Sequence, residues 1–154
     1  MNNVTIQAVS RLLIPFIQLF ALYVIVHGDS GPGGGFQGGV ILAASFILYA
    51  IVFGAKAGRE RVSRKTSDIL SSSGVLIYGG VGLCCMLSGG YYLEYNALPF
   101  ANPHLASHYG IFGIEIGVGV TVAAVMITIF FEMSRRDEKE HADGRAVQEA
   151  RTDD

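Results

Sequence analysis

Glu115 is the residue of this 154-residue chain whose position points most directly to chemistry, because this carboxylate falls inside a long apolar segment and away from its ends. Counted from Tyr109, it lies six residues into the segment, or about 9 Å at the rise of an α-helix. A charged group at mid-membrane costs about 2.5 to 3.5 kcal/mol on insertion scales. Glu115 therefore marks an ion or proton path, with a protonated carboxyl that only hydrogen-bonds a neighbouring helix as the alternative.

Three further polar residues are candidates for the same path, namely His108, His27 and Gln18. His108 precedes Glu115 by seven residues, which places both on one helical face. Both histidines fall near a boundary of an apolar segment, where they could relay protons or serve as polar anchors. Gln18 interrupts the first apolar segment, and a single glutamine there also suits a hydrogen bond between helices.

The other reactive side chains do not assemble into a catalytic group of nucleophile, base and orienting residue. Cys84 and Cys85 are the only cysteines, and they are adjacent in an apolar run, so neither a disulfide framework nor a four-cysteine zinc site can form. We expect no catalytic residues, no metal site and no cofactor, and we expect no independent enzyme. With a net charge of -2, nothing suggests a nucleic-acid partner.

The elements that must position these residues are membrane helices. Hydrophobic residues make up 51% of the chain and charged residues 16%, and the mean hydropathy is +0.43. Four segments are long and apolar enough to span a bilayer, at 8–27, 36–54, 69–91 and 109–133. The predicted fold class is an all-α integral membrane protein, a four-transmembrane-helix bundle, with Thr66 or Ser67 as the cap of the third helix.

The basic residues predict the orientation of the bundle, since Lys and Arg near span ends prefer the cytoplasmic side. Of the 11 basic residues, Arg11 opens the first span, and the others divide equally between the 56–65 loop and the segment after 134. The loops 28–35 and 92–108 contain none. Both termini are therefore expected to be cytoplasmic, with residues 1–134 as the membrane domain and 135–154 as a charged cytoplasmic tail, partly helical or disordered.

A glycine-rich run joins the first two predicted spans and continues into the second. It includes Pro32, Gly33, Gly34, Gly35, Phe36, Gly38 and Gly39. Small residues four apart let two membrane helices touch backbone to backbone, so the run predicts a tight turn with close helix packing, or a loop that also lines an ion path. A nucleotide-binding loop is excluded because the Gly-Lys-Ser/Thr ending is missing and no strand precedes the run.

Two faces of the fourth predicted span differ in character. Gly113, Gly117, Thr121 and Ala124 form a stripe of small residues, whereas His108, Gly119 and Val122 share the face of Glu115. The stripe suits packing against a helix of the same chain. The Glu115 face is expected to meet a helix of a partner or a wet cavity.

Three sequence motifs carry a resemblance to a known family. They are Arg11–Phe16, then His27-Gly28 with Pro32-Gly33-Gly34-Gly35-Phe36-Gln37-Gly38-Gly39, and finally Gly110-Ile111-Phe112-Gly113-Ile114-Glu115-Ile116-Gly117-Val118-Gly119. Together they resemble the B subunit of multisubunit Mrp-type Na+/H+ antiporters, the MnhB family, over about residues 4 to 133. The resemblance implies an accessory subunit in a multi-pass bacterial cell-membrane complex. It also implies, as partners, the other Mrp subunits, the lipid bilayer, and the transported Na+ and H+.

Two alternatives to this function remain, and a third is weighed and set aside. The same module resembles parts of the membrane arm of energy-converting hydrogenases, so the host complex could be of that kind. A purely structural assembly subunit without an ion path is the second alternative. The third, a stand-alone small multidrug exporter, matches in size alone, because such proteins carry their carboxylate in the first span and need little charge bias.

Overall fold

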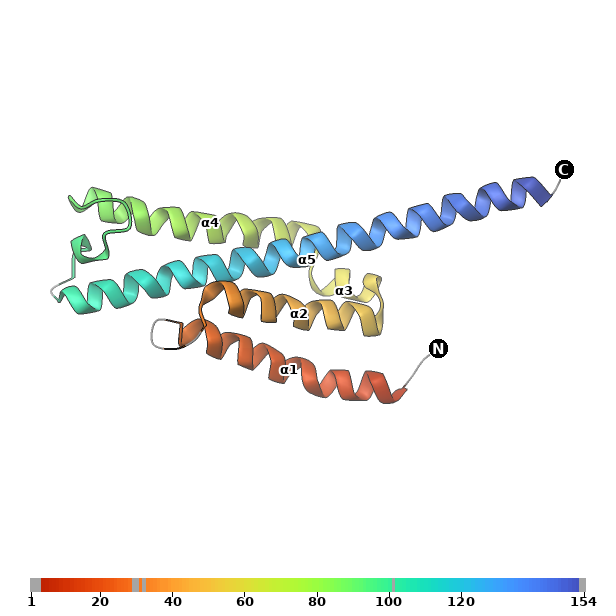
Figure 1. The fold of residues 1–154 in the computed structure, drawn as a ribbon, viewed down its shortest axis with the longest axis horizontal. Coiled ribbons are helices and arrows are strands. Elements are labelled where there is room, and N and C mark those ends of the chain that lie inside the picture. The colour runs from red at the N-terminus through yellow and green to blue at the C-terminus, as the bar shows by residue number, and fades with distance from the viewer. Residues whose placement is uncertain (1–3, 29–30, 32, 101, 153–154) are drawn as a thin grey trace.

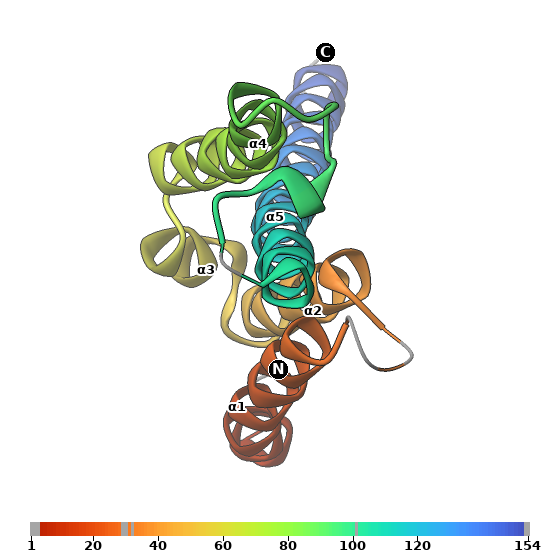
Figure 2. The same ribbon diagram turned by 90° about the vertical axis from the view of Figure 1, so that its left-hand side faces the viewer.

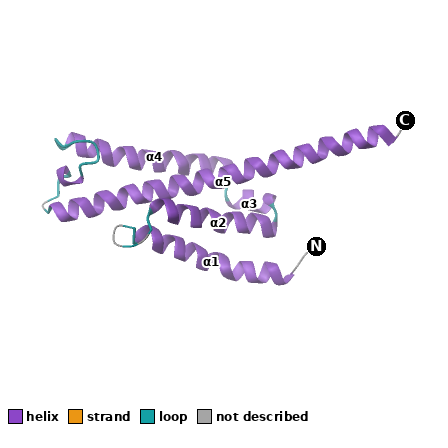
Figure 3. Ribbon diagram, in the orientation of Figure 1, coloured by secondary structure: helices purple, strands orange, loops and turns teal. Residues whose placement is uncertain are grey.

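The structure is a computed structural model that describes residues 4–28, 31, 33–100 and 102–152. Its elements are α1 (Val4–Val26), α2 (Gly35–Phe53), α3 (Ala55–Arg61), α4 (Arg64–Leu87), the 3-10 helix η1 (Tyr95–Ala97) and α5 (Pro103–Thr152). Every regular element in these residues is helical (Figure 3). Four helices are long and apolar enough to cross a membrane: α1, α2, α4 and the 104–136 part of α5. The prediction of an all-helical chain with four candidate spans is confirmed.

The four long helices lie side by side in the order α4, α5, α2, α1 (Figures 1 and 2). α5 packs against both α2 and α4, whereas α1 packs mainly against α2 and forms one edge of the row. The α1–α2 and α4–α5 connections lie at one end of the bundle, which we call the turn end (Figure 1). α3 and the beginning of α1 lie at the opposite end, which we call the basic end (Figure 1).

The third long helix begins and ends earlier than predicted. Ser63, not Thr66 or Ser67, is the N-cap of α4, and its hydroxyl oxygen accepts the backbone N–H of Thr66 at 3.2 Å. At the other end Gly89, with φ of 90°, closes the helix. The backbone N–H groups of Gly89 and Gly90 donate to the carbonyls of Met86 and Cys85, which is a Schellman ending. A left-handed residue here requires glycine, so the helix stops at Leu87.

Two segments at the basic end are helical although the sequence did not predict a regular helix there. α3 occupies part of the loop between the second and third predicted spans, and its seven residues show no apolar repeat that would announce a helix. The backbone of α5 continues without interruption to Thr152, through the segment predicted as partly helical or disordered. Residues 135–152 contain no proline and a single glycine, and they are rich in Arg, Glu and Ala, which favour helix.

The core lies between α2, α5 and the loop after α3, toward the basic end. Its buried members are small or branched residues and one phenylalanine: Ala43, Ala50, Val62, Ala123, Ile127 and Phe131. Large apolar residues instead cover the outside of the bundle, as with Leu12, Leu76 and Leu87, which are 65%, 76% and 79% exposed. This distribution is the inverse of a water-soluble fold and suits helices surrounded by lipid or by other membrane subunits.

Candidate ion-path site

The Glu115 carboxylate lies against the connection between α1 and α2. A Cβ atom added to Gly28 would overlap both carboxylate oxygens, and one added to Gly34 would lie 3.2 Å from Oε1. The Oε2 atom is buried. On the face of Glu115 that was expected to meet a partner helix or a wet cavity, a turn of the same chain lies against the carboxylate.

This connection lies beside α5, part-way along that helix from its beginning (Figure 1). Glu115 is twelve residues from the beginning of α5 at Pro103, or about 18 Å along the helix. In Figure 1 the α1–α2 connection lies correspondingly further inward than the start of α5. Non-helical backbone at membrane depth is tolerated where protein buries it or where it lines a water-filled cavity. The carboxylate and the irregular backbone therefore meet at one level of the bundle.

The turn depends on backbone conformations that glycine adopts readily. Gly33 and Gly34 have φ of 154° and 152°, values that side-chain-bearing residues rarely adopt. α2 then begins at Gly35 with Gly34 as its N-cap. The positive end of the α2 dipole therefore lies beside the Glu115 carboxylate.

The first turns of α2 contact both neighbouring helices through glycines. A Cβ on Gly35 would overlap the carbonyl oxygen of Glu115, and one on Gly39 would lie 2.6 Å from the carbonyl oxygen of Gly119. Gly38 faces the other way, where a Cβ would lie 2.9 Å from the carbonyl oxygen of Ala21 in α1. The side chain of Phe36 is 63% exposed and takes no part in these contacts. α2 therefore lies between α1 and α5 at backbone contact distance.

The opposite face of α5 packs against α4 in the same manner. A Cβ on Gly117 would lie 2.8 Å from the carbonyl oxygen of Gly74, and one on Gly113 would lie 3.3 Å from Cγ2 of Val81. The Thr121 hydroxyl donates to the carbonyl of Gly117 at 2.8 Å. The small-residue stripe does face a helix of the same chain. Both faces of α5 are thus occupied from within the subunit.

The remaining predicted polar residues are distributed along the bundle. His27 and His108 are exposed at the turn end, where His27 stacks on Tyr23 at 4.3 Å and His108 meets Tyr109 edge-on at 5.6 Å between ring centroids. Gln18 lines a cavity of the basic half, about 15 Å along α1 from Gly28. The structure thus places Glu115 beside the α1–α2 connection that contains Gly28, Gly33 and Gly34, which we call the glycine turn. Gln18 lies apart from this turn. Pro32, predicted as part of the turn, lies outside the described residues.

The other connection at the turn end also covers glycines. The ring of Tyr92 occupies the space beside Gly82 of α4, and the ring of Tyr95 occupies the space beside Gly110 of α5. Burial, with a smaller contribution from Tyr78, raises the pKa of the Tyr95 phenol. The phenol is therefore neutral at physiological pH and acts as a packing group.

Sequence reasoning missed a cluster of charges at the basic end. Glu132 lies 2.7 Å from Arg135, 3.5 Å from Arg64 and 3.7 Å from Arg59. The Arg59 guanidinium also lies 4.2 Å from the ring centroid of Phe131. The available signal was an isolated acidic residue at the end of an apolar span, followed at once by arginines. Gly28 was also missed as the neighbour of Glu115, because helical periodicity does not reveal which turn covers a face.

Comparisons with known proteins identify relatives of the chain. A family model for a domain related to the MnhB subunit of Na+/H+ antiporter matches residues 5–128. Proteins named "Putative antiporter subunit mnhB2" from Staphylococcus aureus strains Newman, JH1 and Mu3 are each 27% identical over 135 residues. Each alignment covers 86% of this chain and 95% of the relative. The matched region contains Glu115 and the whole glycine turn.

Proposed function

Because the chain belongs to the family of domains related to the MnhB subunit of Na+/H+ antiporters, we propose that it serves a multisubunit antiporter that exchanges cytoplasmic Na+ for external H+. Its four apolar helices and its antiporter-subunit relatives make it a multi-pass membrane subunit of a cation/proton antiporter. The direction of exchange, the bacterial cell membrane as location and the other Mrp-type subunits as partners belong to the proposal.

The position of the Glu115 carboxylate is the observation that supports an ion path through this subunit. Ionisable residues within membrane spans mark proton relays and ion pathways, and they face the bundle interior. Here the carboxylate faces the glycine turn and the positive end of α2, two features that favour charge within an apolar bundle. Glu115 takes up and releases the transported proton or holds the cation, and His27 and His108 connect it to the solution at the turn end.

Replacement of Glu115 tests this role directly. Glu115→Gln preserves shape and much of the hydrogen bonding but removes ionisation, so the complex assembles while exchange falls by about a hundredfold, the lower end of what a positioned proton-transfer group contributes. The measurement is Na+-dependent proton exchange in membrane vesicles, normalised to intact complex. Glu60→Gln is the matched control, because Glu60 is an exposed residue of α3 and its replacement makes the same chemical change.

A Glu115 that is always protonated and only hydrogen-bonds neighbouring helices would give the opposite pattern of exchange and assembly. If Glu115 only held helices together, Glu115→Gln would exchange at the wild-type rate across the pH range. Glu115→Ala would then reduce the amount of assembled complex, since it leaves buried partner groups unpaired. That result would leave the family assignment intact and would remove the ion path from this subunit.

The proposed topology places both termini and the basic end in the cytoplasm. A variant with Cys84→Ala and Cys85→Ala provides the background for single cysteines at Glu60 and Tyr91, which are exposed at opposite ends of the bundle. An impermeant maleimide added to intact cells is expected to label Tyr91→Cys and to spare Glu60→Cys. The reverse pattern would invert the bundle and would place the turn end on the cytoplasmic side.

Co-purification from native membrane tests the proposed partners. Large antiporter-like subunits identified by mass spectrometry would support an Mrp-type complex. In the proposed complex, residues 1–134 of this chain form the membrane domain and residues 135–154 form the cytoplasmic tail. Recovery of hydrogenase subunits in place of antiporter subunits would assign the chain to the membrane arm of an energy-converting hydrogenase.

A further inference from the structure

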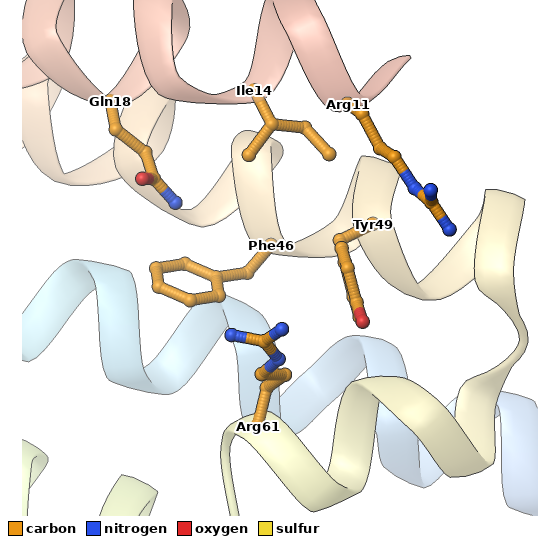
Figure 4. Close-up of a pocket in the computed structure, with 6 residues that line it drawn as sticks. All are labelled: Arg11, Ile14, Gln18, Phe46, Tyr49 and Arg61. Carbon is orange, nitrogen blue, oxygen red and sulfur yellow. The ribbon is translucent and has the colours of Figure 1, made fainter. Parts of the chain in front are cut away.

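A cavity of about 210 Å³ lies at the basic end, between α1, α2 and α3 (Figure 4). It is lined by Arg11, Ile14 and Gln18 of α1, by Phe46 and Tyr49 of α2, and by Arg61 of α3. In Figure 4 the two guanidinium groups lie on opposite sides of the Tyr49 ring, and Ile14 and Phe46 supply an apolar wall. The cavity is therefore amphipathic, with two cations beside hydrocarbon.

The two arginines present hydrogen-bond donors to this cavity. The Arg11 guanidinium lies 5.2 Å from the ring centroid of Phe53, and that of Arg61 lies 5.5 Å from that of Tyr49. Stacking on a ring uses the flat face of a guanidinium and leaves its N–H edges available to an acceptor. Both side chains are exposed.

The charges of Arg11 and Arg61 are not balanced within the part of the chain that the structure describes, where the one carboxylate that forms ion pairs at this end contacts other arginines. Glu132 forms ion pairs with Arg59, Arg64 and Arg135. No described carboxylate lies within 4.0 Å of the guanidinium group of Arg11 or Arg61. Two cations that line one cavity without an acid favour an anionic occupant. This contrast distinguishes the cavity from the Glu132 cluster beside it.

The location of the cavity identifies the kind of anion. Arg11 lies in the second turn of α1 and Arg61 in the connection between two spans, which is where a bilayer places its phosphate groups. α1 forms an edge of the helix row, and its apolar residues Leu12 and Leu19 are each 65% exposed. Lipid chains are the natural neighbours of such a surface.

We propose that this cavity binds one anionic phospholipid, with Arg11 and Arg61 approaching the headgroup phosphate from either side of the Tyr49 ring and the first part of an acyl chain along Ile14 and Phe46. Planar guanidinium groups match phosphate oxygens, and juxtamembrane basic residues attract anionic lipids of the cytoplasmic leaflet. The proposal rests on the membrane location of the subunit and is independent of the ion path through Glu115.

Lipid retention by the intact complex is the test. Wild-type complex, isolated in mild detergent and offered phosphatidylglycerol or phosphatidylcholine vesicles, is expected to retain phosphatidylglycerol in native mass spectra. The double variant Arg11→Gln with Arg61→Gln is expected to retain roughly tenfold less. Lys65→Gln is the matched control, because Lys65 is exposed at the same end, loses the same charge and does not line the cavity. Inorganic phosphate at millimolar concentration should leave the lipid in place.

Photocrosslinking of the wild-type complex keeps the proposal falsifiable if the double variant does not assemble. Phosphatidylglycerol with a diazirine near the start of one acyl chain should label peptides that contain Ile14 or Phe46. Equal retention of phosphatidylcholine, equal retention by the double variant, displacement by inorganic phosphate, or labelling confined to other surfaces would overturn the proposal. A partner subunit in the cavity would give the last of these results.

Discussion

The two ends of the bundle place charge in a membrane protein in different ways. At the turn end the Glu115 carboxylate meets the backbone of Gly28 and Gly34, so the neighbours of the charge are peptide groups and a helix terminus. At the basic end, charge is held by long side chains, with Glu132 among three arginines and Arg59 over the ring of Phe131. Backbone contacts leave no room for one added atom, whereas long side chains can rearrange. The turn end should therefore be far less tolerant of substitution.

Gly35→Ala is the substitution with the largest expected effect on this contrast. The new Cβ would overlap the carbonyl oxygen of Glu115, and two helix backbones must separate to admit it, so we expect destabilisation of about 1 to 3 kcal/mol and a marked loss of assembled complex. Thermal denaturation and the amount of purified complex measure the effect.

The matched control for that substitution is Gly79→Ala. Gly79 lies in α4 with no heavy atom within 4 Å of an added Cβ. Alanine at this position should be neutral or slightly stabilising, by up to about 1 kcal/mol, because it favours helix. Similar losses of stability and of assembled complex in both variants would contradict the prediction. They would show that the close α2–α5 backbone contact is not the reason for the effect of Gly35→Ala.

Gly28→Ala should act on transport more than on assembly. Its Cβ would displace the Glu115 carboxylate, which is the end of a flexible side chain and can move, unlike a backbone. We expect the complex to persist while exchange in vesicles falls several-fold. Combined with Glu115→Asp, whose shorter side chain makes room, the two substitutions should be non-additive by about 0.5 to 3 kcal/mol in activation free energy. Strict additivity would mean that Gly28 and Glu115 do not interact.

Glu132→Gln probes the basic end and should have a smaller effect. Glu132 is about one-third exposed and pairs with three arginines, so its neutralisation should cost about 1 to 2 kcal/mol of stability at low ionic strength. The difference from wild type should shrink in high salt, which screens exposed charges. A melting-temperature difference that persists in 1 M salt, where the Debye length is about 3 Å, would show that Glu132 is held as rigidly as Glu115.

Ser63→Ala should have the smallest effect of the series. It removes the hydroxyl that accepts the Thr66 N–H at the exposed start of α4, a loss of about 0.5 to 1 kcal/mol. Ser63→Asp should retain the cap and most of the stability. Equal melting temperatures for the alanine variant and the wild type would indicate that water replaces the cap at this site.

The helical period was sufficient to predict which residues of α5 share a face, since Glu115 and Gly119 do meet α2 while Gly113 and Gly117 meet α4. It was insufficient to predict that the turn at Gly28 covers the carboxylate, because periodicity is a property of one helix and the covering segment lies far away in sequence. Hydropathy likewise located α4 but not its polar first turn, so the cap at Ser63 was assigned to Thr66 or Ser67. α3 has too few residues for any apolar period to emerge.

Because α5 is one uninterrupted helix, it fixes the distance between Glu115 and the end of the helix at Thr152. Its 50 residues span about 75 Å, whereas the hydrocarbon core of a bilayer is about 30 Å thick. The same rod that fixes the depth of Glu115 continues for 37 residues to Thr152, or about 55 Å. Whatever binds the last turns of α5 is therefore held at a set height from the membrane, and a flexible linker inserted after Arg136 would abolish that spacing while leaving the spans in place.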